Sequence, residues 1–441
     1  MSRRAGELTL KAYLDAQAEY LTERCTKCGK CVEVCPIVQK DFATTRVLKT
    51  VDPVQVVSGV VDFLQGKGLS EYARTWTEAC TGSGECITQC PEHINPRHML
   101  AIALNRIRAE QSKAGQNATG AYYQRMSQII KLAVGLQMSP AQYRRLIGTE
   151  GNKDHAAVVF YLGCNVLRTP VIIFSIMDIL DLLEADYAML GGVANCCGVI
   201  HLKLQGDVER ADIIGTGTLE NLASFRPRKV LHWCPTCVLE FGETVKGYRP
   251  YPFEFEHVSE YLVAKLDTLR QKFQSLPRRV VLHRHDGGLG IYQHVEQLLR
   301  SIPGLELVSI EDERHLAYSC GPGALSNLPD AREAAHRRTV ESAVQAGADI
   351  LVTLYHTCHR DLCGFEGQYP IEIKNWTAIL ASALGLPEHE DRYKRIKLHN
   401  EISAILEDAK EFIEAHALDM STLREVLPNL LVGKERGMSV W

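Results

Sequence analysis

Fifteen cysteines stand out in this 441-residue sequence, and the spacing of the first four predicts iron–sulfur chemistry. Cys25, Cys28, Cys31 and Cys35 precede Pro36, which gives the pattern C-x2-C-x2-C-x3-C-P. In iron–sulfur proteins this spacing lets three thiolates wrap round one cubane cluster while the fourth thiolate binds another. A structural zinc site instead uses two cysteine pairs separated by a longer loop. The first run therefore favours a 4Fe-4S cluster over zinc.

A second run repeats this pattern with one ligand missing: Cys80, Cys86, Cys90 and Pro91, with Ser83 where the second cysteine would stand. In the two-cluster ferredoxin arrangement, the last cysteine of each run crosses over to the other cluster. One 4Fe-4S cluster would then be held by four thiolates, from Cys25, Cys28, Cys31 and Cys90. The other cluster would keep three thiolates, from Cys35, Cys80 and Cys86.

Three thiolates suit a 3Fe-4S cluster, and we expect three irons at this second position from the ligand count. The spacing resembles that of the iron–sulfur subunits of succinate dehydrogenase and fumarate reductase, where such a cluster sits. The alternative is a second 4Fe-4S cluster whose fourth iron takes Ser83 or water. Between the two runs, apolar residues at roughly helical spacing predict that residues 51–77 are helical and pack the runs together.

Five further cysteines follow short β-branched segments that alternate with longer amphipathic ones. This alternation is typical of a parallel sheet with covering helices, and it predicts strands at 157–162, 187–190 and 229–233. Each strand ends at a cysteine or just before one. Because ligands of such sheets collect outside the carboxyl ends of the strands, we expect five thiols to converge: Cys164, Cys196, Cys197, Cys234 and Cys237.

The same pattern recurs about 120 residues later, which predicts a duplicated domain. Strands expected at 279–283, 305–310 and 349–354 lead to Asp286, to Ser319 and Cys320, and to Tyr355 and Cys358. Asp286, Ser319 and Tyr355 occupy three of the five cysteine positions. The second copy is therefore expected to have lost its ligand set.

The overall composition narrows the classes of partner. With 49 basic and 53 acidic residues, the chain lacks the basic excess that nucleic-acid binding requires. The longest apolar run, residues 171–183, is interrupted by Asp178, so we expect no transmembrane segment, while peripheral membrane contact stays open. No apolar stretch follows Arg3 and Arg4 to act as an export signal. We therefore expect a cytoplasmic protein, whose reduced cysteines serve metal binding or redox chemistry.

These motifs resemble the CCG-domain family of iron–sulfur oxidoreductases. The family includes heterodisulfide reductase catalytic subunits, especially the fused type with a ferredoxin-like amino terminus, and iron–sulfur subunits of glycolate oxidase and anaerobic glycerol-3-phosphate dehydrogenase. The resemblance covers nearly the whole chain and rests on both amino-terminal runs, on Cys164, on Cys196-Cys197-Gly198 and on Cys234-Pro235-Thr236-Cys237. It implies an α/β fold class plus an α-helical ferredoxin-like domain.

The implied order is a two-cluster helical domain at 1–108, a connector at 109–154, two repeated Rossmann-like CCG domains, and a helical extension at 389–441. The first CCG domain, at 155–276, carries the intact five-cysteine set, and the second, at 277–388, is degenerate. The connector is rich in polar residues and contains one helical stretch near residues 122–136. The extension is charged, with an apolar side that we expect to pack against the rest of the chain or a partner.

The resemblance also implies a function. In heterodisulfide reductase such a five-cysteine set looks to bind a noncubane 4Fe-4S cluster where a disulfide is cleaved, which would make these five cysteines catalytic here. We expect a subunit of a complex that passes electrons between a flavoprotein or ferredoxin partner and a small disulfide or thiol substrate. The alternative is a pure electron-transfer subunit of a flavin-linked 2-hydroxyacid or glycerol-3-phosphate dehydrogenase.

Two other interpretations concern individual cysteines and histidines. Trp233-Cys234-Pro235-Thr236-Cys237 resembles a thioredoxin redox motif, although the nearby Cys196-Cys197 pair favours cluster ligation. In the second copy, several residues could form a zinc or residual cluster site, fill a vestigial crevice, or place histidines as proton donors beside the intact cluster. These residues are Cys320, Cys358, Cys363, His283, His285, His356 and His359.

Overall fold

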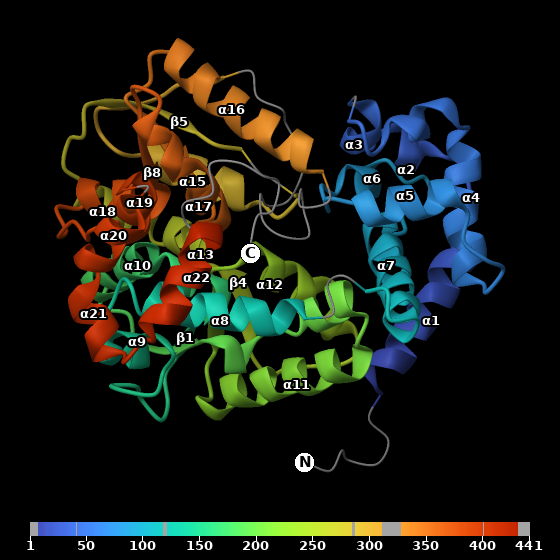
Figure 1. Cartoon of the computed structure of the whole chain (residues 1–441), viewed down its shortest axis with the longest axis horizontal. Helices are drawn as coiled ribbons and strands as arrows, with labels where there is room; N and C mark the ends of the chain where they lie inside the picture. The colour runs from blue at the N-terminus through green and yellow to red at the C-terminus, as the bar shows by residue number, and fades with distance from the viewer. Residues whose placement is uncertain are drawn as a thin grey trace.

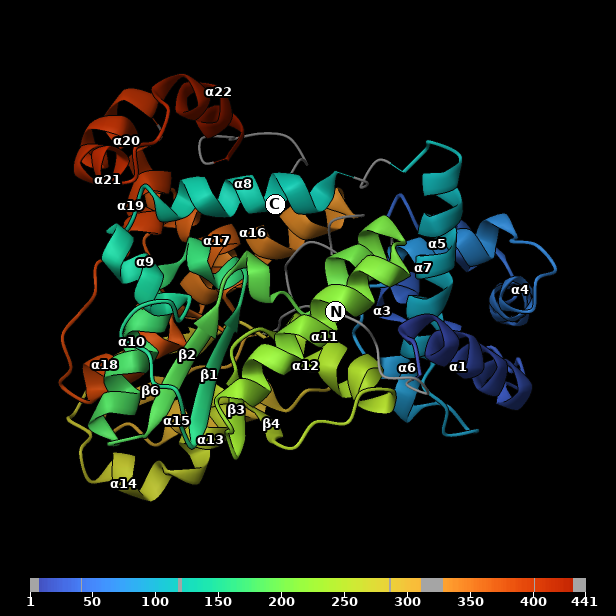
Figure 2. The same cartoon turned by 90° about the horizontal axis from the view of Figure 1, so that it is seen from below.

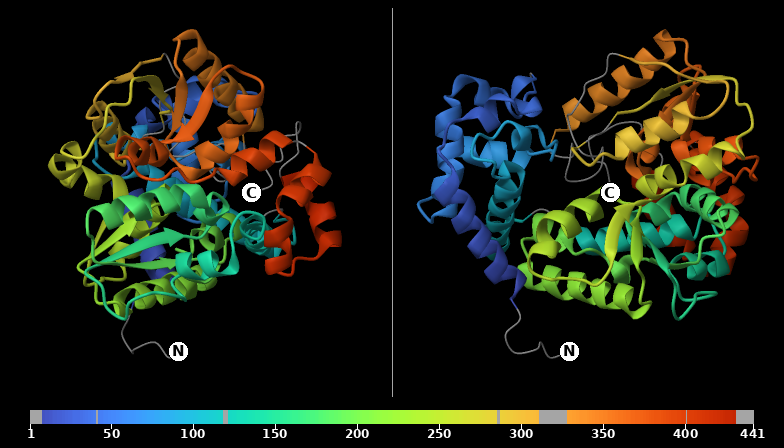
Figure 3. Two further views of the ribbon diagram at one scale, coloured as in Figure 1. Left: turned by 90° about the vertical axis from the view of Figure 1, so that its left-hand side faces the viewer. Right: turned by 180° about the vertical axis from the view of Figure 1, so that it is seen from behind.

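The computed structural model describes residues 8–40, 42–117, 121–284, 287–310, 328–399 and 401–430. Helices from the amino terminus lie to one side of two stacked α/β units (Figures 1 and 3). Within the described residues, no helix combines the length and the apolar character that crossing a membrane demands. Asp286, Ser319, Cys320 and His285, which the sequence singled out in the second copy, lie outside the described residues.

The amino-terminal unit is built from long helices that enclose the two cysteine runs. Its long helices are α1 (Leu10–Arg24), α4 (Pro53–Leu64), α5 (Glu71–Ala79) and α7 (Pro96–Lys113), and its short ones are α2 (Lys30–Glu33), α3 (Pro36–Gln39) and α6 (Glu85–Thr88). The segment 51–77, predicted to be helical, forms two helices, α4 and α5, separated by a short turn. Gly66 and Gly68 adopt left-handed backbone conformations, and the Ser70 hydroxyl then caps α5 by accepting from Ala73 N.

The first α/β unit has a four-stranded parallel sheet in the order β2-β1-β3-β4. Its strands are β1 (Val158–Gly163), β2 (Tyr187–Gly191), β3 (Lys229–His232) and β4 (Glu254–His257). Every residue of β1 is buried, as expected for the centre of a parallel sheet covered on both faces. Helices that follow the strands cover the sheet (Figure 2): α10 (Pro170–Leu182), α11 (Val208–Ser224), α12 (Pro235–Leu239), α13 (Val258–Ala264) and α14 (Leu266–Arg270).

The second unit repeats this sheet in the order β6-β5-β7-β8, so the predicted duplication is confirmed. Its strands are β5 (Arg278–Leu282), β6 (Leu305–Leu307), β7 (Ile350–Thr353) and β8 (Glu372–Asn375), and its helices are α15 (Ile291–Arg300), α16 (Pro329–Gln345), α17 (His356–Leu362) and α18 (Trp376–Ala383). The strand expected at 305–310 ends at Leu307. The edge strands β4 and β8 were not predicted, because their sequences are largely polar and charged.

The connector forms a buried part of the core. Helix α8 (Tyr122–Val134), which confirms the predicted helical stretch, is followed by α9 (Pro140–Leu146). One face of α8 joins the core of the first unit, and the other face, with Ile129 and Leu132, joins the core of the second unit and the tail. The tail packs there with α19 (Arg392–His399), α20 (Ile402–Asp408), α21 (Lys410–Ala415) and α22 (Met420–Leu430).

Candidate metal centres

The structure brings the cysteines of the two amino-terminal runs together in the two groups that the crossed arrangement predicts. A cavity of about 20 Å³ is lined by Cys25, Cys28, Cys31 and Cys90. A second cavity of about 10 Å³ is lined by Cys35, Cys80, Cys86 and Ser83, and also by Cys31. The two cavities are therefore neighbours, and each mixes cysteines from both runs.

Ser83 lies at the three-cysteine site, beside the cysteines of its own run. It is 9% exposed and faces the cavity of the three-cysteine group. The following Gly84 has φ +87°, and a Cβ there would lie 2.9 Å from Arg97 Nη1. Both observations favour glycine at position 84, where the loop passes this buried arginine. Burial raises the pKa of the Cys35 thiol to about 12, so an unliganded thiol at this position stays protonated.

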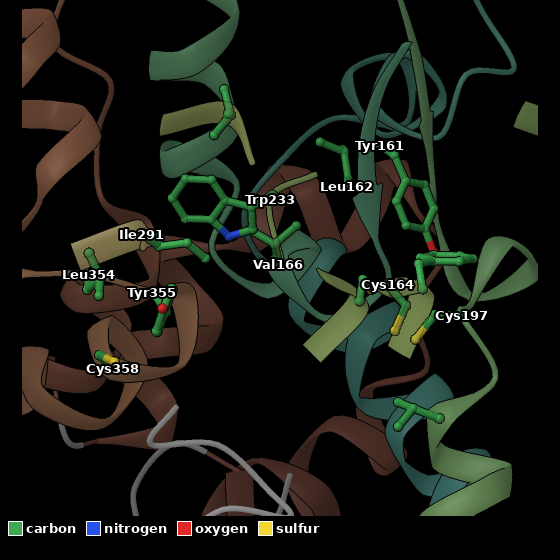
Figure 4. Packing of buried hydrophobic residues seen from close by; sticks show 14 of the residues in the cluster. Tyr161, Leu162, Cys164, Val166, Cys197, Trp233, Ile291, Leu354, Tyr355 and Cys358 are labelled. Carbon is green, nitrogen blue, oxygen red and sulfur yellow. The ribbon is translucent and has the colours of Figure 1, made fainter. Parts of the chain in front are cut away.

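The five later cysteines also converge, at the carboxyl ends of β1, β2 and β3. Cys164 follows β1 directly, Cys234 follows β3 and caps α12, and Cys237 lies in the first turn of that helix. Gly163 makes this approach possible, because a Cβ at its position would lie only 3.1 Å from the Cys237 sulfur. In Figure 4 the sulfur atoms of Cys164 and Cys197 lie side by side.

The five thiols lie close enough together for each to shift the pKa of a neighbour. Cys164 contacts Cys196, the contacts continue through Cys197 to Cys237, and Cys237 contacts Cys234. The hydrogen bond to Cys196 and burial raise the pKa of the Cys164 thiol well above its ordinary value. Five thiolates so close together, four of them buried, would repel strongly unless a cationic group lay among them. The donor set therefore fits an iron cluster, which ionises its thiolate ligands.

A cavity of about 130 Å³ lies beside these five cysteines, and three separate parts of the chain build its wall. The amino-terminal unit contributes Cys80, Gly82 and Arg97; the connector contributes Tyr122 and Met126; the second unit contributes His356 and Thr357. Because Cys80 also lines the smaller three-cysteine cavity, the second amino-terminal site borders directly on the five-cysteine site.

A buried ion pair joins the amino-terminal unit to the first α/β unit at this border. Arg97 Nη2 lies 2.5 Å from Glu243 Oε1, and Arg97 Nη1 donates to the carbonyls of Gly82 at 3.0 Å and Gly287 at 2.8 Å. Burial alone would raise the pKa of Glu243, but the Arg97 charge lowers it overall, so the carboxylate stays ionised. Sequence patterns did not identify either residue, since neither lies in a recognisable motif.

The second copy presents a different chemistry at the equivalent place. Cys358 and Cys363 are fully buried, and Figure 4 shows Cys358 beside Tyr355, apart from Cys164 and Cys197. His359 is held between Thr353 Oγ1 at 3.2 Å and Asp391 Oδ2 at 2.6 Å, so both ring nitrogens have partners. Among the described histidines of this copy, His356 lines the large cavity, where it accepts a hydrogen bond from Trp233 Nε1.

Comparison with known proteins assigns these parts to families. Residues 21–94 match the family described as a 4Fe-4S dicluster domain, and residues 158–242 and 282–362 each match the cysteine-rich domain called CCG. The chain therefore carries a 4Fe-4S dicluster domain followed by two CCG domains. The second CCG domain matches the family although Tyr355 stands where one of the cysteines would be, which agrees with the repeated sheet order.

Several curated relatives share this domain order. The CCG-domain chain is 25% identical to one component of the dihydromethanophenazine:CoB–CoM heterodisulfide reductase from Methanosarcina acetivorans, over 82% of this chain and 94% of that protein. The corresponding protein from Methanosarcina barkeri is 24% identical, over 88% and 99%. One component of the fumarate reductase (CoM/CoB) from Methanothermobacter marburgensis is 23% identical, over 81% and 72%. All three relatives are named as subunits of reductases.

Proposed function

We propose that this chain is the iron–sulfur subunit of a complex that reduces, or in reverse forms, a disulfide bond at its five-cysteine site. In the reductive direction, the substrate sulfur–sulfur bond breaks, and each sulfur gains one electron and one proton, which yields two thiols. The two electrons come from a reduced flavoprotein or ferredoxin partner, and the protons come from water. When bound, the clusters supply the one-electron steps that link this partner to the substrate.

The order of the cavities supports an electron path through the chain. The four-cysteine cavity adjoins the three-cysteine cavity through Cys31, and the three-cysteine cavity adjoins the large cavity through Cys80. We assign a 4Fe-4S cluster to the first site, a 3Fe-4S cluster to the second, and a noncubane 4Fe-4S cluster to the third. Cys28 is exposed, so the first site is the one nearest to a docked partner.

The large cavity is the observation that favours a disulfide substrate over electron transfer alone. A pure relay site needs room for its cluster alone, whereas the space that the five cysteines border is about 130 Å³, against about 20 Å³ and 10 Å³ at the other two sites, and the proposal places the cluster and a substrate in it together. Its lining is mainly apolar, with Arg97 and Lys203 as cations and His356 as a neutral donor. Such a space suits a small organic molecule, which apolar walls hold and a few polar groups orient.

The test compares one cysteine from each of the two CCG domains. Anaerobically purified protein should contain about 11 irons per chain, the sum expected for the three assigned clusters. Cys197→Ala should remove about four of these irons and abolish viologen-driven disulfide reduction, because it deletes a ligand of the third cluster. The matched control Cys358→Ala should keep all the iron. Iron lost from Cys358→Ala and kept in Cys197→Ala would contradict the assignment, as would wild-type protein with only two clusters.

A further inference from the structure

Helix α17 of the second CCG domain is fixed to two loops that carry cysteines of the first domain. His356 opens this helix, and its Nδ1 accepts a hydrogen bond at 3.1 Å from the indole N–H of Trp233, the residue directly before Cys234. Further along the helix, Arg360 Nη1 donates at 3.3 Å to the carbonyl of Asn165, the residue directly after the first of the five cysteines. The second domain is therefore held against the five-cysteine site at two points.

The indole that contacts His356 is itself held in place. Trp233 is fully buried and stacks on Trp376 of the second domain, with 5.9 Å between the ring centroids. The Trp233 carbonyl lies 3.0 Å from His257 Nε2. The Trp376 indole donates to the Leu354 carbonyl at 3.0 Å. Because an indole nitrogen can only donate, Trp233 fixes Nδ1 of His356 as an acceptor. The fold thus selects one tautomer of this histidine.

The selected tautomer places an N–H donor at the large cavity. Burial, together with the charges of Arg360 and Arg168, lowers the pKa of His356 well below its ordinary value, so the ring is neutral and its single proton is on Nε2. Within the described residues Nε2 makes no hydrogen bond, and His356 is one of the residues that line the cavity of about 130 Å³. An unpaired neutral donor at this position suits a ligand in the cavity.

The equivalent residue of the first domain cannot make this contact. His356 and Pro235 each begin the helix that follows the third strand of their domain, α17 and α12, and a proline side chain donates no hydrogen bond. The neighbours of His356 differ in their access to the cavity. Thr357 lines it, whereas Tyr355 and Cys358 are fully buried and do not. Among its described residues, the second domain therefore presents hydrogen-bonding groups to the cavity and no cysteine.

We propose that the substrate disulfide lies with one sulfur toward the five cysteines and the other toward His356, which donates a hydrogen bond from Nε2 to the sulfur that leaves as a thiolate. This inference rests on the proposed function and gives the second CCG domain a substrate-binding role. The sulfur–sulfur bond breaks with two electrons from the reduced partner. Each sulfur then takes one proton from water, and His356 keeps its own proton.

The benefit of this contact grows as the bond breaks. A departing thiolate carries a full charge, and a hydrogen bond to a charged acceptor is about twice as strong as one between neutral groups. His356 therefore stabilises the leaving sulfur more than it stabilises the intact disulfide, which accelerates the reaction instead of only tightening binding. The gain is largest for a substrate whose leaving thiolate is basic, because its charge stays on the sulfur.

The test compares two uncharged disulfides whose thiols differ in basicity. Bis(2-hydroxyethyl) disulfide releases a basic alkyl thiolate, whereas 4,4′-dipyridyl disulfide releases an aromatic thiolate whose charge is delocalised over its ring. With reduced methyl viologen as electron donor, His356→Leu should lower kcat/KM about tenfold or more for the first disulfide and about twofold or less for the second. His356→Gln keeps an amide oxygen for Trp233 and an amide N–H for the cavity, so it should restore most of the activity. The control His155→Leu replaces an exposed histidine in the loop before β1 and should change neither rate.

Product binding gives a readout that does not depend on turnover. Oxidised holoprotein is titrated with 2-mercaptoethanol by calorimetry, and iron is measured in every variant. His356→Leu should weaken the affinity about tenfold and leave the iron content unchanged. Because this change leaves the Trp233 indole without an acceptor, Trp233→Phe/His356→Leu, which removes both partners, provides a better satisfied background. This double variant should show the same loss of affinity.

Four results would overturn the inference. Equal losses for both disulfides would show that His356 supports the fold and not the leaving sulfur. Unchanged rates would show that the substrate does not reach it. His356→Gln as slow as His356→Leu would contradict the donor role, and loss of iron from His356→Leu would show that the histidine supports a cluster. Failure of the proposed function is distinguishable, since wild-type protein would then reduce neither disulfide and would lack iron at the five-cysteine site.

Discussion

The Arg97–Glu243 pair gives the sharpest test of how the cluster domain is held against the first CCG domain. The Arg97 side chain is 10% exposed and the Glu243 side chain is 21% exposed, so both charges lie largely outside water. Arg97 also donates to the Gly82 and Gly287 carbonyls, which belong to loops of the cluster domain and the second CCG domain. Replacing this arginine by glutamine removes a charge on which three parts of the chain depend.

The size of the effect follows from the burial of the pair. Removing one partner of a buried pair costs about 3–5 kcal/mol, because the remaining charge is left uncompensated. For a cooperative unit of 150–250 residues, 1 kcal/mol lowers the thermal midpoint by about 2–4 °C. Arg97→Gln should therefore lower the midpoint by about 6 °C or more. Arg74→Gln is the matched control, since Arg74 is 41% exposed and lies 3.9 Å from Glu78, and such surface pairs contribute at most about 1 kcal/mol.

Calorimetry of anaerobic holoprotein measures these midpoints, and a double-mutant cycle with Glu243→Gln isolates the pairwise contribution. The double variant should be more stable than the sum of the single changes predicts, because it leaves no lone buried charge. Iron analysis of each variant establishes that the midpoints compare equally loaded proteins. If Arg97→Gln lowers the midpoint no more than Arg74→Gln does, the pair does not hold these domains together.

Three further predictions concern single residues of the cluster sites. Ser83→Cys should convert the second cluster from three irons to four and remove the EPR signal of an oxidised 3Fe-4S centre, because Ser83 faces that cavity; an unchanged signal would show that residue 83 stays off the metal. Gly198→Ala should cost about 1–3 kcal/mol in chemical unfolding and reduce iron at the third site, because its φ is +89° and a Cβ would lie 2.6 Å from the Ala211 carbonyl oxygen. Gly217→Ala, in helix α11 with open space around it, should be neutral or stabilising, and equal effects of the two glycine changes would refute the steric argument. Trp233→Phe should lower the unfolding free energy by about 1–3 kcal/mol by leaving His356 Nδ1 unsatisfied, and a loss no larger than that of a conservative exposed change such as Tyr20→Phe would argue against that role.

Sequence patterns predicted the cysteine groups and the central strands because each depends on residues that are close together in the sequence. The spacing within the runs from Cys25 and from Cys80 determines their loops, and the strand that precedes Cys164 is a continuous apolar segment, whereas the one before Cys234 is shorter and has an apolar centre. Both α/β units were predicted from the repeat. The domain boundaries that we assigned, and the ligand roles of the individual cysteines, stay predictions.

The remaining features depend on contacts between segments that are distant in the sequence. The edge strands β4 and β8 form beside an existing strand, although charged residues give them little intrinsic β pattern. The polar composition of the connector concealed how deeply α8 is buried, since two different domains cover its apolar residues. Arg97 was identified only when the fold placed it 2.5 Å from Glu243, and His356 was a candidate from the sequence whose partner Trp233, at 3.1 Å, only the fold shows.

The two-sided burial of α8 has a consequence for synthesis of the protein. As the chain leaves the ribosome, α8 emerges before either sheet has formed, since it precedes β1 in the sequence. The first CCG domain can cover one face early, because domains fold in order as they are made. The opposite face, with Ile129 and Leu132, must wait for β5, β7 and finally Leu423 and Leu427 of the last helix. A nascent chain therefore carries an uncovered apolar helix face until Leu423 and Leu427 have been made, and ribosomes that stop before them release a protein that chaperones or proteases will recognise.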